Sequence, residues 1–119
     1  RFTFEGFLPQ KKGRATRLAE LASEQRTMIF YESPLRLVKT LQELAVTMGE
    51  DRDASVSREI SKIHNTTENG TLKELIDYFT QNNPKGEIVI VVSGKRDDKS
   101  VRKVHRNKYK KDSETEPDE

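Results

Sequence analysis

The stretch Glu87-Ile88-Val89-Ile90-Val91-Val92-Ser93 (residues 87–93) places five consecutive apolar residues between two polar ones. A short run of β-branched residues is typical of a strand in the middle of a sheet that is buried on both faces. Residues 28–31, Met-Ile-Phe-Tyr, read as a second strand buried on both faces. Neither run approaches the ~20 apolar residues that a membrane span needs, so no membrane partner is expected.

Helical patterns alternate with the strands. Residues 34–48 carry a single apolar stripe, with Ser33 placed to cap the helix and Pro34 suited to its first turn. Gly49 can end this helix in a left-handed conformation. Thr71 and Glu74 have capping-box spacing, which predicts a further helix that stops at residues 82–84.

The remaining elements complete the pattern. A basic loop at 10–13 precedes a helix predicted over 14–23, and Asn69-Gly70 is typical of a turn. The short gap between two successive strands predicts an antiparallel hairpin. The predicted order is strand-helix-strand-helix-strand-strand-helix-strand, an α/β fold with a mixed, mostly parallel five-stranded sheet and helices packed on it. The other predicted strands are 2–7, 54–60 and 63–68.

Composition divides the chain after Gly94. Residues 1–94 hold 35 of the 38 hydrophobic residues and equal numbers of basic and acidic side chains, 13 of each. Residues 95–111 carry nine basic and two acidic side chains, and residues 112–119 carry five acidic ones. We therefore expect one folded domain over 1–94 and a charged, disordered tail over 95–119. The basic part of the tail can contact phosphates, or it can fold back on the acidic tip.

Several kinds of site are excluded. The chain has no cysteine, so it has no disulfide or cysteine-ligated zinc, and its two histidines are too few for a histidine-based metal site. It contains neither a glycine-rich phosphate loop nor a GxSxG elbow. The absence of cysteine fits a reducing cytoplasm, and we expect no metal.

Five motifs in order resemble one family. They are GFLP at 6–9, RTMIFYESPLRL at 26–37, REISK at 58–62, GTLKEL at 70–75 and KGEIVIVVSG at 85–94. Together they resemble the C-terminal half of bacterial ribosomal RNA small-subunit methyltransferase I, of the tetrapyrrole methylase superfamily. The resemblance covers residues 1–94. The chain departs from the family pattern at Leu35, usually histidine, and at Asn65, usually acidic.

The resemblance implies an enzyme that transfers a methyl group from S-adenosylmethionine to a cytidine ribose 2′-hydroxyl in small-subunit ribosomal RNA. It implies a donor cleft shared with an N-terminal domain that this chain lacks, usually in a homodimer, so that this half is inactive alone. It identifies no catalytic base. The residues expected to shape the cofactor cleft are Tyr31, Glu32 and Ser33, and those expected to bind RNA are Lys11, Lys12, Arg14, Arg36, Arg58 and Lys62.

Two other functions remain open. A non-catalytic RNA-binding or protein-interaction module would need no donor-binding domain. A precorrin-type methylase half would share the fold and act on a small tetrapyrrole, but such a substrate needs no basic arm.

Overall fold

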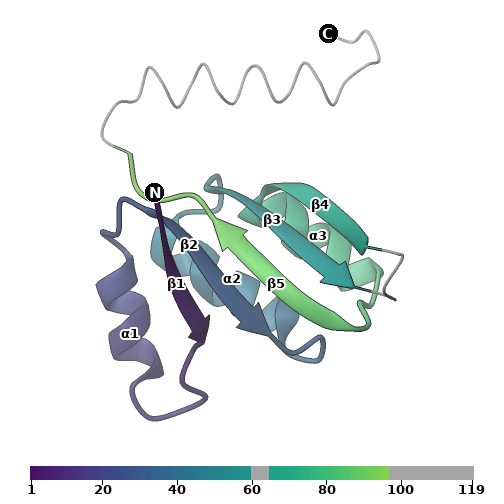
Figure 1. The fold of residues 1–119 in the computed structure, drawn as a ribbon, viewed down its shortest axis with the longest axis horizontal. Coiled ribbons are helices and arrows are strands. Elements are labelled where there is room, and N and C mark those ends of the chain that lie inside the picture. The colour runs from purple at the N-terminus through teal and green to yellow at the C-terminus, as the bar shows by residue number, and fades with distance from the viewer. Residues whose placement is uncertain (60–64, 97–119) are drawn as a thin grey trace, which may run out of the picture.

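The computed structural model describes residues 1–59 and 65–96, which form one sheet with helices packed on it (Figure 1). The predicted order of elements is confirmed. Lys62 and the tail beyond Arg96 lie outside the described residues. The elements are β1 (Phe2–Phe7), α1 (Arg14–Leu21), β2 (Thr27–Glu32), α2 (Leu37–Met48), β3 (Asp53–Glu59), β4 (Asn65–Thr71), α3 (Leu72–Gln81) and β5 (Glu87–Val92).

The sheet is five-stranded and mixed, but the prediction that it is mostly parallel is wrong. Its order is β1-β2-β5-β3-β4, and only β1 and β2 pair in parallel. β5 runs antiparallel to both β2 and β3, and β3 runs antiparallel to β4. The β3–β4 hairpin reverses the direction of the chain, so the crossover through α3 returns β5 as an antiparallel strand between β2 and β3. Two crossovers join strands that run in the same direction: α1 connects the neighbours β1 and β2, whereas α2 connects β2 to β3, between which β5 is inserted.

The helices cover one face of the sheet. In Figure 1, α2 and α3 lie behind the strands, and α1 packs against α2. The strand residues that face them come from alternate positions, as the two-residue period of a strand requires. Together they form one hydrophobic core, made of Leu8, Leu18, Leu21, Met28, Phe30, Leu37, Leu41, Leu44, Ala45, Met48, Val56, Leu72, Leu75, Phe79, Ile88, Ile90 and Val92.

The opposite face of the sheet carries no helix of the described chain, so the prediction that β2 and β5 are covered on both faces is wrong. Tyr31 in β2 is 42% exposed and Phe4 in β1 is 57% exposed. The rings of Phe4 and Phe7 pack on Tyr31, with centroids 5.2 and 5.5 Å from it. A continuous apolar run in the sequence does not distinguish a strand covered on both faces from a strand whose outer side chains are exposed to solvent.

Two predicted helix and turn boundaries differ from the structure. α2 begins at Leu37, and residues 33–36 form a turn in which the Arg36 amide donates to the Ser33 carbonyl at 3.0 Å. The Ser33 hydroxyl accepts from the Leu35 amide at 3.2 Å, so it caps this turn rather than the helix. Gly49 ends α2 at φ 106°, a positive value as predicted, but its ψ of 138° is extended rather than left-handed helical.

The start of α3 confirms the predicted capping box. The Thr71 hydroxyl accepts from the Glu74 amide at 3.2 Å, and the Thr71 amide donates to the Glu74 carboxylate at 2.8 Å. Asn69-Gly70 was predicted as a turn, but both residues lie in β4, which runs directly into the helix. Gly70 serves a different need, because a Cβ there would lie 2.7 Å from the Glu74 carboxylate.

The chain leaves the sheet through a close contact at Gly94. A Cβ at this position would lie 2.1 Å from the Gln25 carbonyl oxygen, so only glycine fits here. The next amide, Lys95, donates to the Glu24 carbonyl at 2.7 Å. This contact joins the end of β5 to the segment that enters β2.

Candidate functional site

The carboxyl ends of β1, β2 and β3 lie at one end of the sheet, because these three strands run in the same direction. This end of the sheet is called the candidate edge. The loop after β1 holds Lys11 and Lys12, and the turn after β2 holds Ser33 and Arg36. Arg58 lies near the end of β3. These candidate residues, predicted from separate motifs, therefore lie at the same end of the sheet, which is the usual position of ligands in α/β sheets.

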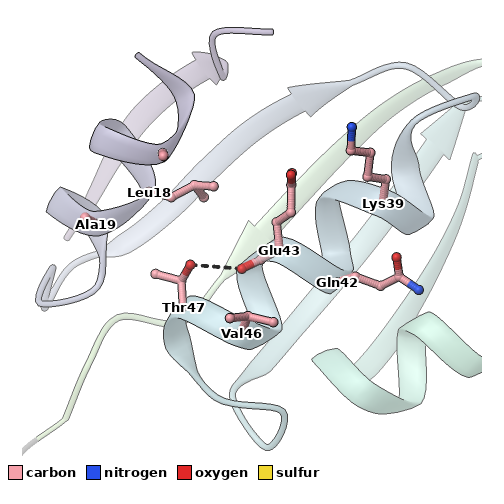
Figure 2. A pocket seen from close by; sticks show the side chains of 8 residues that line it. Leu18, Ala19, Lys39, Gln42, Glu43, Val46 and Thr47 are labelled. Atoms are coloured by element: carbon pink, nitrogen blue, oxygen red, sulfur yellow. Dashed lines mark hydrogen bonds between the residues drawn. The ribbon is translucent and has the colours of Figure 1, made fainter. Parts of the chain in front are cut away.

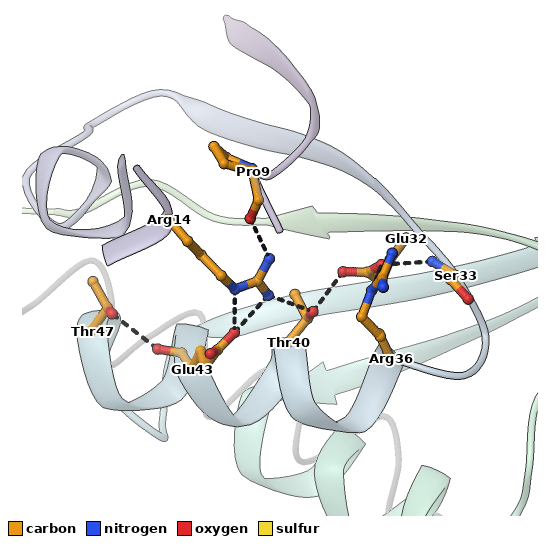
Figure 3. Close-up of polar contacts among 8 residues, drawn as sticks. All are labelled: Pro9, Arg14, Glu32, Ser33, Arg36, Thr40, Glu43 and Thr47. Carbon is orange, nitrogen blue, oxygen red and sulfur yellow. Dashed lines mark hydrogen bonds and ion pairs between the residues drawn. The ribbon is translucent and has the colours of Figure 1, made fainter. Parts of the chain in front are cut away.

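Arg14 ties the loop after β1 to α2 (Figure 3). Its Nη1 donates to the Pro9 carbonyl at 2.9 Å. Its Nε and Nη2 donate to one Glu43 carboxylate oxygen at 2.9 and 2.6 Å, and Nη2 also donates to the Thr40 hydroxyl at 2.9 Å. Arg14 is only 9% exposed, so its guanidinium is committed to internal partners.

Glu32 continues the same polar chain at the end of β2. One carboxylate oxygen accepts from the Thr40 hydroxyl at 2.5 Å, and the other accepts from the Ser33 amide at 2.7 Å. The Arg36 Nε lies 3.6 Å from the second oxygen. Glu32 is 6% exposed, and these contacts provide the partners that a buried carboxylate needs.

The predicted RNA-binding residues differ in the exposure of their side chains and in their internal hydrogen bonds. Lys11 and Lys12 are exposed, and the Arg36 side chain is 39% exposed. Arg58 is half-buried and donates from Nε to the Thr66 hydroxyl at 2.9 Å. Arg14 has a structural position, as described above. Exposed and half-exposed cations can reach a phosphate, whereas Arg14 cannot do so without breaking its internal hydrogen bonds.

The residues predicted to shape a cofactor cleft do not form one side-chain pocket. Tyr31 points to the open face of the sheet, while Glu32 points to the helix-covered face, because neighbouring strand residues alternate. Both Glu32 oxygens already have partners inside the chain. The Ser33 hydroxyl is held by the Leu35 amide. A methyl donor would thus need further surface beyond these three side chains.

Sequence reasoning missed Thr40 and Glu43, which complete the polar chain. Thr40 is 1% exposed and lies on the buried stripe of α2 between Leu37 and Leu41. A polar residue on an apolar stripe was the available signal, because a buried hydroxyl requires partners. Arg14 likewise lies four residues before Leu18, on the buried face of α1.

Two hollows lie in the described surface, and the first shares Glu43 with the polar chain described above. The first, of about 660 Å³, is a groove between α1 and α2 (Figure 2). It is mainly apolar and includes Val46, whose side chain is almost fully exposed. The second, of about 370 Å³, lies where β3 begins and β4 ends. Neither hollow includes a residue predicted for the cofactor or RNA.

Other charged side chains of the described chain form local pairs. Arg26 donates to both carboxylate oxygens of Glu24, and these bonds lower the pKa of Glu24 to about 2. On α1, hydrogen bonds to Glu20 and Glu5 raise the pKa of Arg17.

Over residues 1–59 and 65–96, no cluster of three acidic or histidine side chains is placed to hold a metal ion, and no helix is long and apolar enough to span a membrane.

Curated relatives match the chain across its described part. Ribosomal RNA small subunit methyltransferase I of Synechocystis sp. is 47% identical over 95 residues, covering 79% of this chain and 34% of that protein. The proteins of the same name from Thermotoga maritima and Xylella fastidiosa strain Temecula1 are 42% and 48% identical, covering 80% and 82% of this chain and 42% and 37% of theirs. The chain thus spans about two fifths or less of these relatives.

Solved structures agree on the fold. Cobalt precorrin-4 methyltransferase CbiF has a TM-score of 0.59 at 18% identity, over 78% of this chain and 40% of that chain. The methyltransferase CobJ has a TM-score of 0.56 at 16% identity, over 82% of this chain and 44% of that chain. No family model matches. The resemblance indicated by the five motifs is confirmed: the chain is homologous to part of the ribosomal RNA small subunit methyltransferase I proteins and has the fold of the tetrapyrrole methyltransferases.

Proposed function

We propose that this chain is the C-terminal half of a methyltransferase that transfers a methyl group to a cytidine ribose 2′-hydroxyl in small-subunit ribosomal RNA. The observation that carries the proposal is that the loops after β1 and β2 and the end of β3, which hold the candidate residues, all lie at the same end of the sheet. The identity of 42–48% to ribosomal RNA methyltransferases supports it.

The exposed cations at this edge are suited to the RNA backbone. Phosphate contacts fix the register of a nucleic acid without reading its sequence, and lysine and arginine supply them. Lys11, Lys12 and Arg36 have the exposure for this role, and Arg58 is half-buried at the same end of the sheet. Lys62, the last residue of the REISK motif, completes the proposed set. Arg14 contributes by holding the loop that carries the two lysines.

The methyl donor is proposed to be S-adenosylmethionine, bound in a cleft between this chain and a second domain. The open ring of Tyr31 and the turn at Ser33 would form one wall, and Glu32 would hold that turn in place through the Ser33 amide. No residue is assigned as the base. The proposal includes a homodimer, as the resemblance implies, that works in the cytoplasm, which the absence of cysteine fits.

The test uses the complete reading frame that contains these 119 residues. The purified protein is incubated with S-adenosylmethionine labelled in the methyl group and with small ribosomal subunits from a strain that lacks the modification. Label on a cytidine ribose is expected, and the 119-residue chain alone should give none. A folded protein that binds the donor but labels no RNA would reject the ribosomal RNA substrate and favour a small tetrapyrrole.

A further inference from the structure

Thr40 lies at the centre of a polar chain that joins two loops at the candidate edge (Figure 3). Its hydroxyl accepts from Arg14 Nη2 at 2.9 Å and donates to a Glu32 oxygen at 2.5 Å. Beyond Arg14 the chain reaches the Pro9 carbonyl in the loop after β1. Beyond Glu32 it reaches the Ser33 amide in the turn after β2.

The hydroxyl of Thr40 is suited to this central position because one oxygen can both donate and accept. Arginine only donates and an ionised carboxylate only accepts, so Arg14 and Glu32 meet through a group that serves both. Thr40 is 1% exposed, so water has little access to replace it. Within the described residues, no buried side-chain nitrogen or oxygen lacks a partner.

We propose that Thr40 is a positioning residue that fixes the loop after β1 relative to the turn after β2. Thr40 thereby sets the spacing between Lys11 and Lys12 on one side and Arg36 on the other. The importance of this spacing rests on the proposed function. Thr40 itself touches neither RNA nor donor in this proposal. Its role is to make the two loops move as one unit.

Amide hydrogen exchange on the 119-residue chain tests this coupling without any ligand. The reporters are the Arg14 amide, which donates to the Lys11 carbonyl at 3.1 Å, and the Ser33 amide, which donates to Glu32. In Thr40→Val both amides should exchange about tenfold faster, because a buried hydrogen-bonding group is lost. Thr40→Ser keeps the hydroxyl and should restore the wild-type rates.

The matched control is Thr47→Val, the same change two turns later on α2. The Thr47 hydroxyl donates to the Glu43 backbone carbonyl at 2.9 Å, and none of the hydrogen bonds of the polar chain runs through it. Its substitution should leave both reporter amides unchanged. Faster exchange at only one reporter in Thr40→Val, or at neither, would overturn the coupling.

A second variant decides the case if Thr40→Val fails to fold. Glu32→Gln keeps the shape of the side chain and removes its charge. Arg14 does not touch Glu32 directly, so faster exchange of the Arg14 amide in Glu32→Gln would reveal coupling through Thr40. A change confined to the Ser33 amide would refute it.

RNA binding tests the consequence for the proposed function, with an unmodified transcript of small-subunit ribosomal RNA as the probe. We expect Kd to rise about five- to tenfold in Thr40→Val, and to stay at the wild-type value in Thr40→Ser and Thr47→Val. If the wild type binds and Thr40→Val binds equally well with both loops loosened, the positioning role is wrong. If the wild type does not bind, the RNA contact itself is wrong, while the exchange data still decide the coupling.

Discussion

Substitution of Gly94 by alanine tests how the end of the domain is closed. An alanine Cβ would lie 2.1 Å from the Gln25 carbonyl oxygen and 2.5 Å from that of Arg26. Ordinary contact starts near 3.4 Å, so the two segments must separate by more than 1 Å. Both obstructing atoms belong to the backbone, so no side-chain rotation relieves the clash.

The expected cost follows from two effects. Overpacking of this kind costs roughly 1–3 kcal/mol. The same displacement breaks the hydrogen bond from the Lys95 amide to the Glu24 carbonyl, which adds about 1 kcal/mol. The free energy of unfolding should therefore fall by about 2–4 kcal/mol, and Tm by roughly 10–25 °C for a domain of this size.

Thermal unfolding of the 119-residue chain, followed by far-UV circular dichroism, measures this change. Gly70→Ala is the matched control, because the three atoms nearest its new Cβ all belong to the Glu74 side chain: the carboxylate oxygen at 2.7 Å can turn away, and the Cβ at 3.3 Å needs only a shift of a few tenths of an ångström. That variant should lose about 1 kcal/mol or less, mainly from the capping box. A Gly94→Ala domain within 1 kcal/mol of wild type, or a Gly70→Ala domain equally destabilised, would refute the steric reasoning.

Three further predictions concern charge and capping. The double variant Lys11→Ala and Lys12→Ala should reduce the salt slope of ribosomal RNA binding by about two, because each lysine neutralises one phosphate; an unchanged slope in a titration series would exclude the contact. Thr71→Ala should lower the free energy of unfolding by about 1 kcal/mol through loss of the α3 cap, measured by urea denaturation, with Thr71→Ser as the control. The Glu24 carboxyl should titrate near pH 2 by NMR, so that its favourable pairing with Arg26 is present above its ordinary pKa and is lost as the pH falls towards 2; in Arg26→Gln the midpoint should return towards the ordinary value, and a midpoint that stays near 2 would reject the pairing.

Local signals in the sequence predicted the elements because each depends on neighbouring residues. The stripe of α2 and the capping box of Thr71 and Glu74 both involve contacts within a few residues. The direction of β5 depends instead on distant partners, and an apolar run looks the same in either direction. The predicted start of α2 was wrong because Ser33 does not cap the helix. Its amide donates to the buried Glu32 carboxylate, and its hydroxyl accepts from the Leu35 amide within the turn.

The candidate site followed the same rule. Motifs placed the polar residues at strand ends, and the topology then brought them to one edge. What the motifs could not give was the direction of each side chain. Arg14 was grouped with the cations expected to bind RNA, yet its position on the buried face of α1 directs its side chain inward to Glu43.

The position of β5 has a consequence for how the chain acquires its structure. β5 is the last strand in the sequence, and it alone joins the β1–β2 pair to the β3–β4 hairpin. During synthesis the residues that precede β5 can form two separate half-sheets, in which β2 and β3 each have one side without a strand partner until β5 is made. The core closes cooperatively only when residues 87–92 have left the ribosome, and a chain released before that point would present two edges open to aggregation.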